Sequence, residues 1–199
     1  MPNSPKTEPR LLFFAGSARE KSWNKKLAKL GEMIADANGI KATFADLADY
    51  PMPIYCGDIE TKDGPPDNAR KLKALMNVHT GIFIASPEYN ASFSALLKNV
   101  IDWVSHTRDE GEQPLEVFRT RVFALGSASP GGMGGLRGLS QLRLVFELGL
   151  NALVLPDQFA VPRAVDAFDE QGHLKNKDAQ EQFKLLIQKL ARAAHVLHG

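Results

Sequence analysis

Regular structure in this chain starts with LLFFAGSAREKSWN at residues 11–24. Its five apolar residues are typical of a short buried strand, and the small and polar residues 16–22 are typical of a loop. Beyond the loop, apolar residues recur at three- and four-residue steps from Trp23 to Ile34. This spacing predicts an amphipathic helix over residues 22–37. A strand that turns directly into such a helix indicates an α/β fold with a parallel sheet.

The same alternation of apolar runs and amphipathic stretches continues along the chain. We predict strands at residues 11–15, 41–46, 81–86, 121–126 and 152–155, and helices at residues 22–37, 67–79, 92–105, 136–148 and 178–197. Residues 47–66 form a long connection with several Pro and Gly, which we expect to be irregular. The pattern predicts a doubly wound five-stranded parallel sheet with right-handed crossovers and helices on both faces. We expect one domain over residues 1–199, with a flexible N-terminus at residues 1–9.

Charge and composition argue against several classes of protein. The formal net charge is +1 and no dense basic patch with interleaved aromatics occurs, so we expect no nucleic-acid partner. The longest apolar runs are far shorter than the roughly 20 residues of a membrane span, so we expect no membrane association. Cys56 is the single cysteine, which excludes an internal disulfide and a thiolate-rich metal site. A cytoplasmic location is the simplest inference.

Donor groups are concentrated in the loop after the first strand. Ser17, Arg19, Ser22 and Asn24 supply hydroxyl, guanidinium and amide donors at the start of a helix, where free N–H groups and the helix dipole attract anions. A simpler alternative is that Ser22 only caps the helix. The loop lacks both the G-x-x-x-x-G-K-[ST] and the G-x-G-x-x-G patterns, so a phosphate monoester is favoured over a triphosphate or a pyrophosphate.

Ligands of doubly wound sheets bind beyond the carboxyl ends of the strands, so the loops after the third and fourth strands also matter. The third strand continues into Pro87, Glu88, Tyr89 and Asn90, which offer a rigid proline, an aromatic face and exposed backbone groups. A planar conjugated ring needs this combination, although an ordinary turn before a capped helix is the alternative. The fourth strand is followed by the glycine-rich residues 127–137.

Three motifs together make the sequence resemble the NADPH-dependent FMN reductase family of flavodoxin-like proteins, which includes quinone, azo-dye and chromate reductases. The motifs are G-S-x-R-x-x-S-x-N at residues 16–24, P-E-Y-N-x-S at residues 87–92 and L-K-N-x-I-D-W at residues 97–103. Residues 127–137 are similar to the glycine-rich loop of the family after strand four. The resemblance covers most of the chain.

The resemblance implies a flavodoxin-like sheet of strand order 2-1-3-4-5, bound FMN, and NADPH or NADH as co-substrate. The residues carried over from the motifs are Ser17, Arg19, Ser22 and Asn24 for the FMN phosphate, Pro87, Glu88, Tyr89 and Asn90 around the isoalloxazine ring, largely through backbone contacts, and Ser127, Gly131 and Gly132 along its pyrimidine side. Two departures stand out: Ala91 occupies a position where the family often has Gly, and residues 93–94 replace a common apolar-Pro pair. Both departures concern the acceptor pocket more than the flavin site.

The flavin would carry the chemistry, so we assign no side chain as nucleophile, acid or base and no catalytic residue. The five histidines have no metal-like spacing, and we predict no metal site. The expected function is transfer of electrons from NAD(P)H through FMN to a small acceptor such as a quinone, azo compound, free flavin or chromate.

Two other functions remain open from the sequence. An FMN-binding electron carrier without reductase activity would dock a protein partner, but such carriers usually present an acidic face and this chain is nearly neutral. The second alternative is a flavodoxin-like interaction or sensor protein that has lost the cofactor. We also expect a homodimer or homotetramer, because the long connection at residues 47–66 and the helix at residues 92–105 carry more apolar residues than packing on one face requires.

Overall fold

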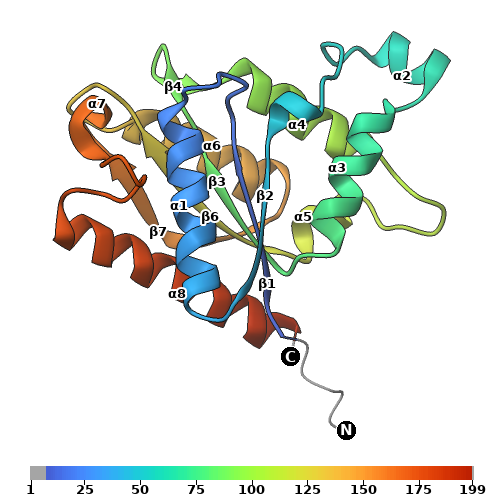
Figure 1. The fold of residues 1–199 in the computed structure, drawn as a ribbon. Coiled ribbons are helices and arrows are strands. Elements are labelled where there is room, and N and C mark those ends of the chain that lie inside the picture. The colour runs from blue at the N-terminus through green and yellow to red at the C-terminus, as the bar shows by residue number, and fades with distance from the viewer. Residues whose placement is uncertain (1–7, 199) are drawn as a thin grey trace, which may run out of the picture.

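The computed structural model describes residues 8–198 and contains a five-stranded parallel sheet of order β2-β1-β3-β6-β7 (Figure 1). Its strands are β1 (Arg10–Ala15), β2 (Lys41–Ala45), β3 (Gly81–Ala85), β6 (Val122–Ala128) and β7 (Leu153–Val161). Counting only these five strands along the chain, the order is 2-1-3-4-5. The predicted flavodoxin-like, doubly wound fold is therefore confirmed.

Helices cover both faces of the sheet (Figure 1). One face carries α1 (Trp23–Ala37) and α8 (Lys177–His198), and the other carries α3 (Asp67–Asn77), α4 (Ala95–His106), α5 (Glu116–Arg119) and α6 (Leu136–Leu144). In β1, Leu11 and Phe13 pack towards α1 and α8, whereas Leu12 and Phe14 pack towards α3 and α4. Burial on both faces explains why the strands of this chain are continuously apolar rather than alternating.

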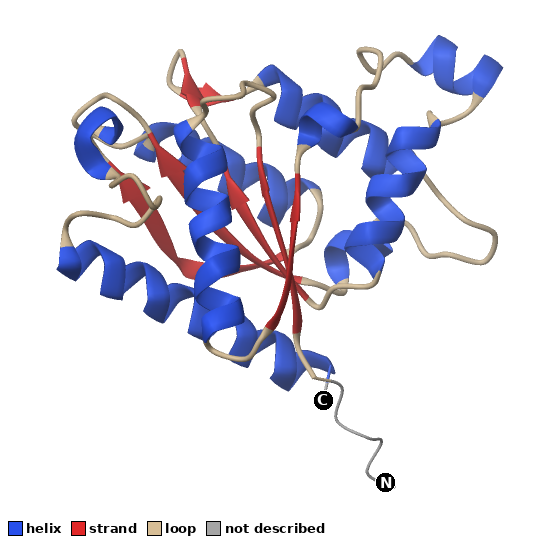
Figure 2. Cartoon of the chain, in the orientation of Figure 1, coloured by secondary structure: helices blue, strands red, loops and turns tan. Residues whose placement is uncertain are grey.

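The connection at residues 47–66 is more regular than predicted. It contains a 3-10 turn (Leu47–Asp49) and the helix α2 (Gly57–Asp63), which projects from the rest of the fold (Figure 2). Trp103 Nε1 of α4 donates a hydrogen bond of 2.7 Å to Pro53 O, and this contact fixes the connection on α4. The expectation of irregular structure was wrong because α2 has no buried residues, and hence no apolar stripe marks it in the sequence.

The helix predicted at residues 92–105 begins at Ala95 instead. Ser92 and Phe93 form strand β5, which pairs antiparallel with β4 (Glu88–Tyr89) in a hairpin. Ser94 is the true N-cap, because its Oγ accepts a hydrogen bond of 3.1 Å from Leu97 N–H. The sequence predicted the cap two residues too early.

The boundaries of the last strands and of the helix between them also differ from the prediction. The fourth predicted strand, β6, extends to Ala128, and the fifth, β7, extends to Val161. The β6–β7 register shifts between Phe123 and Leu125, and the part of β7 beyond this irregularity was not predicted. The helix predicted at residues 136–148 consists of α6 followed by a π-helical turn (Val145–Gly149).

The short helix α7 (Ala164–Ala167) follows β7. The predicted flexible N-terminus at residues 1–9 lies, apart from Glu8 and Pro9, outside the described residues. Among residues 8–198, no helix combines the length and the apolar character that crossing a membrane requires.

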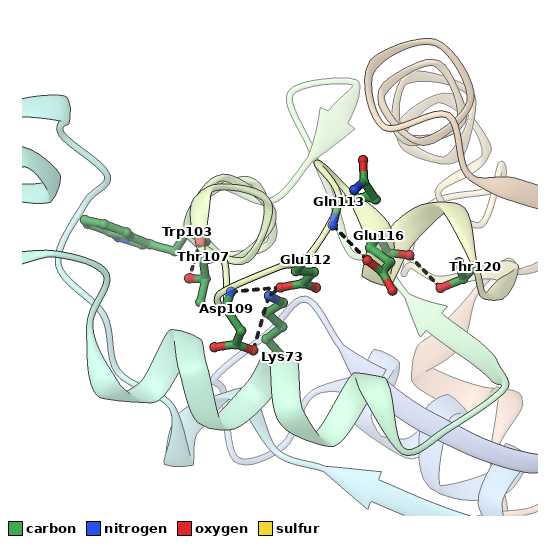
Figure 3. A network of polar contacts seen from close by, with 8 residues as sticks. All are labelled: Lys73, Trp103, Thr107, Asp109, Glu112, Gln113, Glu116 and Thr120. Atoms are coloured by element: carbon green, nitrogen blue, oxygen red, sulfur yellow. Dashed lines mark hydrogen bonds and ion pairs between the residues drawn. The ribbon is translucent and has the colours of Figure 1, made fainter.

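A buried lysine joins α3 to the connection between α4 and α5. Lys73 is 2% exposed, and its ammonium group pairs with Glu112 and lies 3.7 Å from Asp109 Oδ2 (Figure 3). The Asp109 N–H donates to Glu112 Oε2 at 3.0 Å. Burial by itself raises the pKa of Glu112, but the hydrogen bonds from Asp109 N–H and Lys73 lower it below the ordinary value of 4.5.

The Glu112→Gln variant should lower the free energy of unfolding by about 2 kcal/mol, because the buried Lys73 ammonium group loses its nearer carboxylate and keeps only Asp109, 3.7 Å away. Since the folded-state pKa of Glu112 is lowered, the contribution of the pair is complete above about pH 4.5 and is lost as the pH falls further. Urea unfolding between pH 3 and pH 7 should therefore show a flatter acid profile for the variant. The double variant Lys73→Met/Glu112→Leu should regain most of the loss, and a Glu112→Gln protein as stable as the wild type would contradict this interpretation.

Candidate functional site

Three loops follow the carboxyl ends of neighbouring strands of the sheet. They are the first loop (residues 16–22, after β1), the second loop (residues 86–94, after β3) and the third loop (residues 129–135, after β6). Gly16 N–H donates to Ala85 O at 2.9 Å, and Ser86 N–H donates to Gly126 O at 2.7 Å. The backbone pairing of the sheet therefore continues into the start of the first two loops.

Side chains then join the first loop to the second, and the helix that follows the first loop to the strand that precedes the third. Ser94 Oγ donates to Gly16 O at 2.6 Å, which links the second loop to the first. Asn24 Nδ2 donates to Ala128 O at 2.8 Å, and Ala128 N–H donates to Asn24 Oδ1 at 2.9 Å. This pair of bonds fixes the start of α1 at the end of β6, where the third loop begins.

The first loop presents free donors next to a capped helix. Ser22 caps α1, because its Oγ accepts a bond of 3.4 Å from Lys25 N–H, so the capping role weighed as an alternative is real. Within the described residues, the backbone N–H groups of residues 17, 18 and 22–24 donate to no protein group. Capping and anion binding are therefore compatible here, since the cap uses only one of the donors at this helix start.

Arg19 and Lys25 give the first loop positive charge in two different ways. Arg19 is exposed, with its guanidinium carbon 5.8 Å from the centre of the Trp23 ring, and it pairs with no carboxylate of residues 8–198. Lys25 is buried, and its Nζ bonds to Asp46 at 2.7 Å and to Ala18 O at 3.2 Å. The Arg19 guanidinium is thus available to bind an anion, whereas Lys25 stabilises the conformation of the loop.

Lys25 was missed from the sequence, because a lysine on an amphipathic helix is usually exposed. Asp46, its partner, lies directly after β2, and β2 and β1 are neighbours. The position of Asp46, at the end of the strand beside the first loop, was the one feature of the sequence that could have indicated a buried partner for Lys25. Asn24 was predicted to contact phosphate. Its amide is largely used by Ala128, which leaves one N–H of Nδ2 for a ligand.

The second loop is a tight hairpin that carries the four residues predicted to surround a ring. Asn90 and Ala91 form its two-residue turn, with φ of 51° and 63°, as the turns of two-residue hairpins require. Pro87 is buried below the hairpin, and Tyr89 is 50% exposed near its tip. The tyrosine therefore keeps much of its surface available for a ligand.

Glu88 differs from its neighbours, because its side chain is buried rather than exposed to a ligand. Its Oε2 accepts a bond of 3.0 Å from Gly138 N–H in α6, and its Oε1 accepts a bond of 2.9 Å from Arg137 Nε. Partial burial raises the pKa of Glu88, but these hydrogen bonds lower it below its usual value. The carboxylate is therefore ionised at neutral pH.

The region after β6 combines an unpaired hydroxyl with close backbone contacts. Ser127 lies in β6 rather than in a loop, and its buried Oγ has no hydrogen-bond partner among the described residues. A Cβ on Gly135, whose φ is 93°, would lie 1.9 Å from that Oγ. Gly131 and Gly132 are exposed. The close approach thus depends on Gly135, which the sequence did not single out, and not on Gly131 or Gly132.

The structure thus brings the predicted residues to one edge of the sheet, where they lie in separate groups and not in a single cluster. Ser17, Arg19, Ser22 and Asn24 lie together in and beside the first loop, and Ser127 and Glu88 both lie near Gly135. Tyr89 and Asn90 lie on the exposed hairpin. Within residues 8–198, no three His, Cys, Asp or Glu side chains are grouped so that they could hold a metal ion.

These features fit FMN. The free N–H groups of the first loop and the unpaired Arg19 suit a phosphate monoester. The unsatisfied Ser127 hydroxyl and the exposed face of Tyr89 suit a planar ring with a polar edge.

Residues 9–166 match the family model described as NADPH-dependent FMN reductase. The chain belongs to this family. The expected family membership, the FMN cofactor and the enzymatic nature of the protein are thereby confirmed.

Relatives in this family share about a third of their residues with the chain. An NAD(P)H-dependent FMN reductase of Pseudomonas aeruginosa is 32% identical over 96% of this chain and 97% of its own length. A quinone reductase of Escherichia coli is 32% identical over 73% of each protein. Among solved structures, the flavoenzyme FerB, an NAD(P)H:(acceptor) oxidoreductase of Paracoccus denitrificans, superposes with a TM-score of 0.77 over 96% of this chain and 99% of that chain at 22% identity. The last comparison supports the fold alone.

The Ala91→Gly variant should raise the free energy of unfolding by about 1 kcal/mol, because a left-handed conformation is costly for alanine and not for glycine. Urea or thermal unfolding measures the change. Ala95→Gly is the matched control, since Ala95 lies in the ordinary helical conformation of α4 and glycine there should destabilise. An Ala91→Gly protein less stable than the wild type would show that the turn is not strained.

Proposed function

We propose that the three loops together bind FMN and that the chain uses it to transfer electrons from NADPH or NADH to a quinone or a free flavin. The observation that carries the proposal is the set of free N–H donors in the first loop, joined through Ser94 and Asn24 to the loops that would surround the ring. Relatives named as FMN reductase and quinone reductase support the choice of donor and acceptor.

The first loop would hold the phosphate. The backbone N–H groups of residues 22–24 form the positive end of α1, and those of residues 17 and 18 lie in the loop before it. Both sets would donate to the phosphate, together with the hydroxyls of Ser17 and Ser22. Arg19 supplies the charge, and Lys25 keeps Ala18 in place. We assign no proton transfer to these residues, because they orient the ligand and do not react with it.

The second and third loops would hold the ring. Pro87, Glu88, Tyr89 and Asn90 would contact it mainly through their backbone, and Ser127, Gly131 and Gly132 would lie at its pyrimidine side. When bound, FMN supplies the hydride chemistry that the side chains lack. The buried Ser127 hydroxyl can donate one hydrogen bond to the ring, and N–H groups of the loops favour negative charge at that edge.

The sequence alone also left open an FMN-binding electron carrier without reductase activity. The net charge of the chain is +1, which gives no support for an acidic docking face, and the relatives carry enzyme names, so we set the carrier aside in favour of the reductase. Three finer points stay predictions: the acceptor in the cell, a cytoplasmic location, and self-association as a homodimer or homotetramer. The connection at residues 47–66, packed on α4 with Ile54 exposed, is the surface we propose for that association. We also take residues 1–199 to be one FMN-binding domain.

The Arg19→Ala variant should weaken FMN binding about tenfold, because it removes one charge-assisted contact to the phosphate. Titration of the apoprotein with FMN, followed by flavin fluorescence, measures the dissociation constant. Lys21→Ala is the matched control, since it removes an exposed charge from the same loop at a position without a predicted contact. Equal affinity of Arg19→Ala and the wild type would contradict the phosphate assignment.

Rapid mixing of the FMN-loaded protein with NADPH, without oxygen, should bleach the flavin absorption, and a quinone added afterwards should restore it within seconds. The same experiment with NADH gives the donor preference. A flavin that neither nucleotide reduces would exclude the reductase and leave the electron carrier.

A further inference from the structure

The helix α6 begins without a cap of its own. Its N-cap residue, Gly135, has φ of 93° and no side chain that could accept a hydrogen bond. The first N–H groups of a helix lack acceptors within the helix, and the turn before α6 supplies one only to Leu136, whose N–H donates to Met133 O at 3.2 Å. In this chain the acceptor comes from the second loop, because Glu88 Oε2 lies 3.0 Å from Gly138 N. Glu88 therefore caps a helix that lies about 50 residues further along the chain.

The Glu88 carboxylate is held between the helix start and one cation. Arg137 Nε donates to Glu88 Oε1 at 2.9 Å, and Arg137 Nη2 contacts the same oxygen. The Glu88 side chain is 7% exposed, whereas that of Arg137 is 57% exposed. The arginine thus covers the carboxylate on its solvent side, and charge-assisted bonds of this kind are stronger than those between neutral groups.

The packing around this contact leaves little room for a side chain at position 138 of α6. A Cβ on Gly138 would lie 3.1 Å from Ser92 O and 3.3 Å from Glu88 Cγ, and one on Gly135 would lie 3.6 Å from Glu88 Cβ. The hairpin and the first turn of α6 are therefore in direct contact. Any larger residue at Gly138 would push the two elements apart.

We propose that Glu88 is a positioning residue, whose carboxylate fixes the hairpin of the second loop against α6 and thereby sets the distance between the second and third loops before a flavin binds. The inference rests on the proposed FMN site. The Glu88 side chain then has a structural role in the site that is separate from the contacts between its backbone and the ring. This role also implies that the start of α6 is not a phosphate site for the nicotinamide nucleotide, because a carboxylate already occupies it.

Glu88→Gln and Arg137→Gln, singly and together, test the proposal. Each single variant removes the charge from one side of the contact; Glu88→Gln keeps the length of the side chain, and Arg137→Gln shortens it. Glu147→Gln is the matched control, because it removes an ion pair between Arg143 and Glu147 (2.6 Å) that lies outside the three loops. Three quantities are measured: amide hydrogen exchange of residues 88–93 and 136–139 in the apoprotein, the dissociation constant for FMN, and the midpoint potential of the bound flavin.

Both single variants should exchange faster in the two segments and bind FMN about tenfold more weakly. The double variant should be no weaker than either single one, because the two side chains act through one contact. The midpoint potential should shift in the variants and not in Glu147→Gln. Gly138→Ala should reproduce the loss of FMN affinity with the carboxylate intact.

Unchanged FMN affinity and potential in Glu88→Gln would overturn the inference, even if hydrogen exchange increased, because Glu88 would then have only a structural role. Additive losses in the double variant would also overturn it. A wild-type apoprotein that binds no FMN would instead overturn the proposed function, and the inference with it. The two failures are thus distinguishable.

Discussion

The paired hydrogen bonds between the Asn24 side chain and the Ala128 backbone hold the candidate site together. Both residues are buried, so losing either bond would leave a polar group unsatisfied at a cost of about 1–3 kcal/mol. The contact joins the start of α1 to the end of β6, and β3 lies between β1 and β6 in the sheet. The first loop is therefore held across the end of β3, directly where the second loop begins. Without this contact, the donors of the first loop and the residues around the ring would have no fixed relation.

Two further contacts complete the arrangement. Ser94 links the second loop to Gly16 in the first, and Glu88 links the second loop to α6 behind the third. The first and second loops are thus joined directly, and the third is held through β6 and α6, the elements on either side of it. Preorganisation of this kind lowers the entropy that a ligand must remove on binding. It also explains how a site made mostly of loop residues can be specific, since the loops are fixed to one another and not only to the sheet.

The sequence predicted the sheet well, because buried parallel strands and amphipathic helices leave a strong periodic signal. The three loop motifs were likewise found, since their glycines, prolines and serines are local features. The contacts between loops were not, because they join residues far apart in the chain. Glu88 was expected at the ring through its backbone, and no local feature indicated that its carboxylate caps α6. Lys25 was not considered at all, because burial of a lysine depends on Asp46, which only the folded sheet brings close. The hairpin at Ser92 was missed because its two-residue strands are too short to show a pattern.

The central claim is that FMN binds across the three loops with its phosphate at the first. A crystal structure of the protein grown with FMN tests this most directly. The account predicts that the phosphate oxygens lie within hydrogen-bonding distance of N–H groups of residues 17, 18 and 22–24, with the ring beside the hairpin of the second loop. A phosphate bound elsewhere, or a ring that does not touch the second loop, would contradict it.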